Sequence, residues 1–280
     1  MQNHRLQAHA AVLLANIIFG LGVPVTKLLL DQWVSPMAYM ATRCLGAAAI
    51  FWLISLFLPR EKVAPRDLTV IILGGLGIVV SQTLTAWALT FTTPVYFSLI
   101  ATLTPVATML CAILFIGEKI SARGIAGVVL GVAGAMLMVF IGWQGGSGKN
   151  DLLGILTILS MLTWAVYLII TRKVSARYTA VTQMKWVFLA SAVAVLPFSW
   201  TDLQSAPLYS TATQWSGLAE MGFIVVFATV AGYFAIPFAM RCLKATTVSV
   251  YTNLQPIVAS LVAIAISQDV LTWDKPVALI

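Results

Sequence analysis

Polar side chains recur at helical spacing inside two of the most apolar stretches of this chain. In each stretch a serine, a second polar residue four positions later and a proline three positions after that would share one face of a helix. These sets are Ser98, Thr102 and Pro105, and Ser249, Asn253 and Pro256. Polar groups that face lipid are costly, so both faces should turn inward, where hydroxyl and amide groups could bind a polar solute. Hydrogen bonding between helices is the alternative that the spacing leaves open.

A second pair of faces combines polar and aromatic groups. One carries Asn16, and the other carries Ser160, Trp164 and Tyr167. An aromatic ring beside a polar group suits a solute with an apolar body and a polar head. The same rings could instead be packing residues or part of an interfacial belt. Further polar or aromatic candidates inside apolar stretches are Gln82, Trp87, Tyr96, Tyr233 and Tyr251.

Arg43 is a charged residue placed about two turns inside an apolar stretch that begins at Pro36. A cation at the centre of a bilayer costs at least about 2.5–3.5 kcal/mol unless it is paired or hydrated. Arg43 could therefore bind a substrate carboxylate, or it could reach an interface or pair with backbone carbonyls. Lys185 lies nearer the end of its own stretch, so snorkelling to the interface explains it best.

Composition places the whole chain in a membrane. Of its 280 residues 60% are hydrophobic and 9% are charged, against about 25% charged residues in a soluble domain. The mean hydropathy is +0.98. The net charge of +7 would suggest nucleic acid as a partner in a soluble protein, but here the cations lie at the ends of apolar segments. The three cysteines show no paired spacing, so neither a disulfide nor a metal framework is expected.

The apolar segments are long enough for membrane-spanning helices, which need about 20 residues each. They cover 9–30, 36–58, 68–91, 94–117, 121–142, 152–171, 180–198, 214–239, 245–267 and a last segment that opens near Pro276. Because the chain ends soon after Pro276, we expect the last helix to be truncated. The sequence thus predicts an all-α integral membrane protein with ten helices.

The chain also repeats itself. Ala88, Leu103 and Pro105 match Ala239, Leu254 and Pro256 at a constant offset, which predicts one repeat over 1–144, a linker over 145–151 and a second repeat over 152–280. Most of the sixteen Lys and Arg residues fall on one side of the predicted membrane, so the N-terminus should be cytoplasmic. Five crossings per repeat then give two halves of opposite orientation, an inverted repeat.

Short motifs in both halves resemble the EamA-type drug/metabolite transporters. In the first half they are Asn16-Ile17-Ile18-Phe19-Gly20, Lys27, Arg43, Leu103-Thr104-Pro105 and Gly117-Glu118, and in the second Trp164, Arg172-Lys173, Lys185, Leu254-Gln255-Pro256 and Gln268-Asp269. The resemblance spans nearly the whole chain and implies ten helices in two five-helix halves, with metabolite transport, often export. Lys185 and Gln268-Asp269, which stands in place of Gly-Glu, depart from the family pattern.

A secondary transporter is the function that these features favour. No catalytic or ATP-binding motif is present, so neither an enzyme nor a cofactor is expected. The predicted substrates are amino acids or related neutral or zwitterionic solutes, with aromatic amino acids as one candidate, exported across the inner membrane. The expected partners are a small-molecule substrate and the lipid bilayer, and no nucleic acid is expected to bind. A homodimer is a further alternative that the sequence leaves open. The alternatives are a cation multidrug exchanger, which usually needs a deep carboxylate, and a non-transporting receptor or assembly protein.

Overall fold

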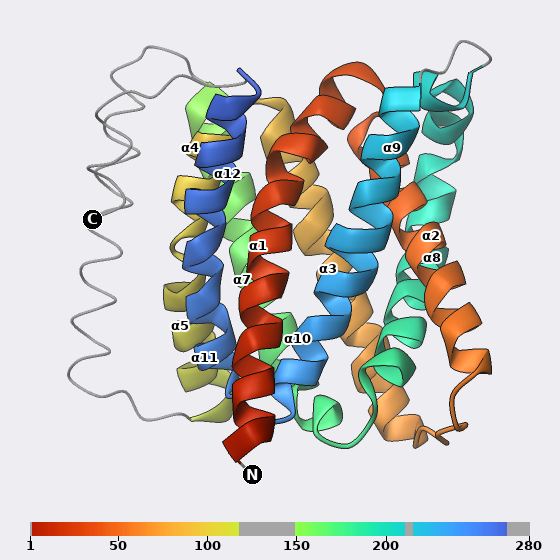
Figure 1. Cartoon of the computed structure of the whole chain (residues 1–280), viewed down its shortest axis with the longest axis vertical. Helices are drawn as coiled ribbons and strands as arrows, with labels where there is room; N and C mark the ends of the chain where they lie inside the picture. Colours follow the sequence, from red (N-terminus) through yellow and green to blue (C-terminus); the bar gives the residue numbers. More distant parts are fainter. Residues whose placement is uncertain (1, 118–148, 211–214, 268–280) are drawn as a thin grey trace.

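The computed structural model describes residues 2–117, 149–210 and 215–267 (Figure 1). Over these ranges the regular structure is helical. Five uninterrupted helices are long and apolar enough to cross a membrane: α1 (Gln2–Gln32), α2 (Pro36–Leu56), α3 (Pro65–Thr90), α7 (Lys149–Ser175) and α8 (Ala180–Ser205). Two further candidate spans, Trp215–Met240 and Ala245–Ala265, are built from several consecutive helical pieces. The predicted class, an all-α protein with multiple membrane-spanning segments, is confirmed.

The composite spans change helical geometry along their length. The first consists of α9 (Trp215–Phe223), the π-helical segment η2 (Ile224–Ala231) and α10 (Gly232–Met240). The second consists of α11 (Ala245–Val250), the 3₁₀ turn η3 (Tyr251–Asn253) and α12 (Leu254–Ala265). A short 3₁₀ turn, η1 (Pro207–Tyr209), follows α8. The predicted segments 121–142 and the one near Pro276 lie outside the described residues.

The segment predicted as one helix over 94–117 is two helices, which corrects the sequence-based boundary. α4 (Pro94–Ala101) and α5 (Thr104–Ile116) are separated by a tight turn in which the Leu103 amide donates to the Ile100 carbonyl at 3.1 Å. Pro105 lies at the start of α5, where the missing amide hydrogen of a proline is tolerated. Because Pro105 matches Pro256, the break and the η3 turn precede equivalent prolines in the two halves.

Helices from the two halves interleave. α3 packs along α7 and α2 along α8, while α1 packs against α10 and α12 and α5 packs against α7. In Figure 1, α1 lies between α12 and the α9–α10 span. Small residues permit the closest approaches: a Cβ atom at Gly75 of α3 would lie 2.7 Å from the carbonyl oxygen of Val187 in α8. The cavity described below lies among these interleaved helices.

Candidate functional site

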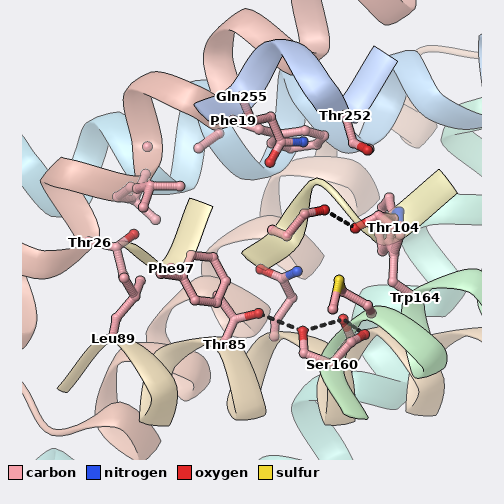
Figure 2. A pocket seen from close by; sticks show the side chains of 18 of the residues that line it. Phe19, Thr26, Thr85, Leu89, Phe97, Thr104, Ser160, Trp164, Thr252 and Gln255 are labelled. Atoms are coloured by element: carbon pink, nitrogen blue, oxygen red, sulfur yellow. Dashed lines mark hydrogen bonds between the residues drawn. The ribbon is translucent and has the colours of Figure 1, made fainter. Parts of the chain in front are cut away.

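A pocket of about 120 Å³ lies among helices of both halves. A cavity needs roughly 10–15 Å³ by this measure to hold one water molecule, so the pocket has room for a small organic solute. Figure 2 shows Gln255 and Thr252 on one side of the pocket, across from Thr85 and Ser160. None of the described residues that line the pocket is acidic. Its side chains with hydroxyl, amide or guanidinium groups are Thr26, Tyr39, Arg43, Ser81, Gln82, Thr85, Thr104, Ser160, Tyr233, Thr252 and Gln255.

Arg43 supplies the only cation among these described lining residues. Its side chain is 6% exposed. The guanidinium donates to the Thr229 hydroxyl at 2.9 Å, to the Gln82 amide oxygen at 3.1 Å and to the Tyr39 hydroxyl at 3.2 Å. The guanidinium also lies 5.2 Å from the centre of the Tyr39 ring. These acceptors are all neutral, and the ion pairs found in the described ranges are Lys27–Asp31 and Arg177–Asp67. Within the described ranges, Arg43 is thus a buried cation held in place without a carboxylate partner.

Thr229 reaches Arg43 because of the π-helical geometry of η2. Its hydroxyl donates to the carbonyl of Ile224, five residues earlier, at 2.7 Å while it accepts from Arg43. In a π-helix the backbone bonds also span five residues, and such segments occur frequently at functional sites. Thr229 is fully buried within an apolar run, and sequence analysis did not single it out.

Aromatic rings form another wall of the pocket. Phe19 and Trp164 line it together with Tyr233, whose ring centre lies 5.4 Å from that of Phe19 and 5.8 Å from that of Trp164, both in edge-to-face contact. Edge-to-face pairs of this kind stabilise each other by about 0.5–1.5 kcal/mol beyond area burial. This wall gives the pocket an apolar surface in addition to its polar groups.

Hydroxyl groups bridge α3 and α7 on the side facing Gln255. Ser160 and Thr85 share a hydrogen bond of 2.7 Å, visible in Figure 2, and Ser81 donates to the Ser160 carbonyl at 2.9 Å. The described residues contain no group of three or more His, Cys, Asp or Glu side chains that could hold a metal ion. The described lining thus offers hydrogen-bonding groups, one cation and aromatic rings.

Four of the predicted residues, Arg43, Gln82, Trp164 and Tyr233, line the pocket together. Two others lie directly behind it. Asn16 is buried and accepts a hydrogen bond from Gln255, and the ring of Tyr167 packs 5.1 Å from that of Trp164. Predicted residues from five separate helices, α1, α2, α3, α7 and α10, therefore lie at one place.

The polar faces predicted for segments 94–117 and 245–267 do not line the pocket as predicted. Ser98 and Ser249 are buried but do not line the pocket, and Thr102 is partly buried at the break between α4 and α5. Asn253 is exposed and does not line the pocket. The side chain of Tyr96 lies outside the described part of the structure.

The interruption of both helices changes which residues at and after each break face the pocket. The predicted faces assumed an unbroken helix with 3.6 residues per turn, whereas a 3₁₀ turn has 3.0 residues per turn and rotates every residue that follows. Thr104, Thr252 and Gln255 consequently line the pocket instead. Sequence analysis missed all three as binding candidates, although the prolines next to Thr104 and Gln255 marked the interruptions.

Comparisons with known proteins agree with this architecture. The model of the EamA-like transporter family matches twice, over residues 6–140 and 152–280. The uncharacterized transporter YyaM of Bacillus subtilis (strain 168) is 23% identical over 245 residues, covering 84% of this chain and 78% of that protein. The WAT1-related protein At5g13670 of Arabidopsis thaliana is 27% identical over 212 residues, but the match covers 64% of this chain and 56% of that protein.

A solved crystal structure shares the fold at 18% sequence identity. The TM-score is 0.70, and the superposition covers 99% of this chain and 94% of the other. The two family matches span almost the whole sequence, and a transporter is by kind not an enzyme. The chain therefore belongs to the EamA-like transporter family, as a multi-pass membrane protein that transports small solutes.

Proposed function

We propose that this transporter carries amino acids or closely related solutes, exporting them across the inner membrane, and that Arg43 binds the substrate carboxylate. The observation that carries the proposal is the buried guanidinium at the pocket wall, surrounded by neutral acceptors. A bound carboxylate would supply the missing negative charge, and hydrogen bonds between ionised groups are roughly twice as strong as neutral ones.

The pocket chemistry argues against the rival function of a cation multidrug exchanger. An exchanger that trades protons for cations usually needs a carboxylate deep in the membrane. The described lining contains Arg43 and no acidic side chain, so an organic cation would meet repulsion there. The aromatic wall of Phe19, Trp164 and Tyr233 supports a substrate with an apolar body, which keeps aromatic amino acids among the candidates.

Two inverted repeats of five helices each, 1–144 and 152–280, are part of the same proposal. The contacts of α2 and α8, which occupy equivalent places in the repeats, support it. Ser35 at the start of α2 donates to Asp202 near the end of α8, and Thr179 at the start of α8 donates to Glu61 just after α2 at 2.8 Å. Equivalent helices therefore run antiparallel, as inversion requires.

The helix contacts are also reciprocal between the proposed repeats. α1 packs against the α9–α10 span as α7 packs against α3, and α1 packs against α12 as α7 packs against α5. Exchanging the halves reproduces this pattern, which supports a pseudo-twofold axis between them. The distribution of Lys and Arg favours a cytoplasmic N-terminus.

Uptake into proteoliposomes tests the carboxylate role. Arg43→Gln removes the charge, and we expect the affinity for transported amino acids to fall by about tenfold to a hundredfold, the worth of a hydrogen bond to a charged group. Lys185→Gln is the matched control, because Lys185 is also a cation within a span but lies over the Trp52 ring and outside the pocket lining.

Thermal unfolding of the purified variants accompanies the uptake measurement. We expect Arg43→Gln to remain folded and inserted, because the neutral glutamine leaves no unpaired buried charge. Unchanged affinity combined with a lower unfolding temperature would show that Arg43 is structural and would refute the carboxylate role.

A further inference from the structure

Gln255 has an amide whose orientation is fixed by its neighbours. It lines the pocket at the start of α12, just before Pro256. Its Nε2 atom donates to Oδ1 of Asn16 at 2.7 Å, and Nδ2 of Asn16 donates to the backbone carbonyl of Val12 at 2.8 Å. Asn16 itself is 1% exposed, so the Asn16 end of this chain of bonds is buried.

The direction of both bonds follows from the Val12 carbonyl. A carbonyl oxygen only accepts, so Asn16 must turn its nitrogen toward Val12 and its oxygen toward Gln255. That oxygen can only receive the nitrogen of Gln255. The remaining amide atom of Gln255 is Oε1, an acceptor, and it is the atom left to face the pocket.

The amide of Gln82 is also oriented by its hydrogen-bond partner, but here the nitrogen atom is the one left for the pocket. A guanidinium only donates, so the bond of 3.1 Å from Arg43 fixes Oε1 of Gln82 toward Arg43 and leaves its Nε2 donor for the pocket. α2 and α3, which carry Arg43 and Gln82, pack against each other, whereas α12 packs against α1 and α4. Donors and the oriented acceptor therefore come from different walls of the pocket.

We infer that Gln255 binds the ammonium group of a zwitterionic substrate whose carboxylate is held by Arg43 and Gln82. This inference rests on the proposed function and names its substrate class: solutes that carry both groups, in preference to simple carboxylic acids. Thr252 adds a hydroxyl beside Gln255 on the same wall (Figure 2). Asn16 is a positioning residue, since it contacts Gln255 and does not line the pocket.

Three related compounds distinguish the contributions of the ammonium and carboxylate groups to the binding affinity. They are phenylalanine, 3-phenylpropanoate, which lacks the ammonium, and 2-phenylethylamine, which lacks the carboxylate. Dissociation constants are measured by calorimetry on the purified protein. Wild type should bind phenylalanine at least about tenfold more tightly than 3-phenylpropanoate, the worth of one hydrogen bond to a charged group. Gln255→Leu should remove most of this preference and leave the affinity for 3-phenylpropanoate unchanged.

Two further variants sharpen the result. Gln255→Glu should raise the affinity for 2-phenylethylamine, because a full negative charge replaces the acceptor. Asn16→Ala should reduce the preference for phenylalanine by a smaller factor, because it frees the Gln255 amide to rotate, and a purely structural role of Asn16 would weaken both acids alike.

The outcomes distinguish this inference from the proposed function. If Gln255→Leu weakens both acids by the same factor or changes neither, the ammonium site is refuted even when Arg43→Gln weakens both. If Arg43→Gln leaves both acids unaffected, the carboxylate role fails, and the ratio of the two affinities in Gln255→Leu still decides the role of Gln255. Failure of wild type to bind any of the three compounds would overturn both.

Discussion

The helix pair α2–α8 and the interrupted spans α4–α5 and α11–α12 serve the pocket in different ways. α2 and α8 are continuous, and hydrogen bonds between the halves join them at both ends, Ser35 to Asp202 at one end and Thr179 to Glu61 at the other. The interrupted spans break just before Pro105 and Pro256, and both breaks border the pocket through Thr104 and Thr252.

The difference between the continuous and the interrupted helices shows how one fold can combine a charge in a fixed position with pocket residues whose backbone can shift. Arg43 comes from the continuous pair. Its guanidinium donates hydrogen bonds to three acceptors, and these bonds fix its position. The acceptor groups at Thr252 and Gln255 come from a span with fewer regular backbone bonds, where small backbone changes alter which side chains face the pocket. We expect substitutions at helix contacts of the continuous helices outside the pocket to affect stability first, and substitutions of pocket residues near the breaks to affect binding first.

The largest effect on stability is expected at the contact between α3 and α8. In Gly75→Ala the added Cβ would lie 2.7 Å from the Val187 carbonyl oxygen, a backbone atom that cannot move alone. We expect the free energy of unfolding to fall by up to about 3 kcal/mol, as in overpacked cores, despite the gain of about 1 kcal/mol in helix propensity. Thermal unfolding in detergent measures the change.

Gly77→Ala is the matched control on the same helix. Its Cβ would meet its nearest neighbours, in Thr163 and Tyr167, at 3.7 Å, an ordinary contact distance. This variant should be as stable as wild type or slightly more stable. Equal losses of stability in both variants would contradict the assignment of the α3–α8 contact as the critical one.

A smaller effect is expected at the π-helical segment that orients Arg43. Thr229→Val removes the acceptor for the Arg43 Nε atom and keeps the shape of the side chain. We expect a loss of about 1–2 kcal/mol of stability, because a buried donor of a charged group loses its partner, and a several-fold weaker affinity for amino acids. Thr163→Val is the control, since its hydroxyl bonds only to carbonyls of its own helix. Wild-type affinity in Thr229→Val would show that Arg43 does not need this contact.

The helices of this protein could be predicted from hydropathy, but the faces of the interrupted helices could not. The predicted segment 36–58 and the observed α2 (Pro36–Leu56) agree closely because length and apolar character determine a membrane span. Arg43 was identifiable because a charge inside such a segment needs an explanation. Asn253 was predicted to face the cavity but does not line the pocket, and spacing rules do not include the η3 turn in which it lies. Thr229 depends on a π-helix for which the sequence offers no signal.

The hydrogen bonds at one end of the α2–α8 pair have a consequence for the pH dependence of stability. Glu61 accepts from the Thr179 amide at 3.0 Å and from the Thr179 hydroxyl at 2.8 Å. Partial burial alone would raise the pKa of Glu61, but hydrogen bonds from Thr182 and Thr179, aided by the charge of Arg241, outweigh it and hold the pKa below its ordinary value.

The smallest expected effect is therefore a loss of stability in acid that depends on Glu61. Because the folded pKa is lowered, the unfolded chain takes up a proton first as the pH falls, and the contribution of Glu61 is present above the ordinary glutamate pKa of about 4.3 and disappears as the pH falls through the folded value. The contribution should stay under about 1 kcal/mol, because Glu61 is partly exposed and solvent screens it. Thermal unfolding of wild type and Glu61→Gln between neutral pH and pH 3 measures it: the stability difference between the two proteins should shrink toward the acid end. A constant difference across this range would show that ionised Glu61 does not stabilise this end of the α2–α8 pair.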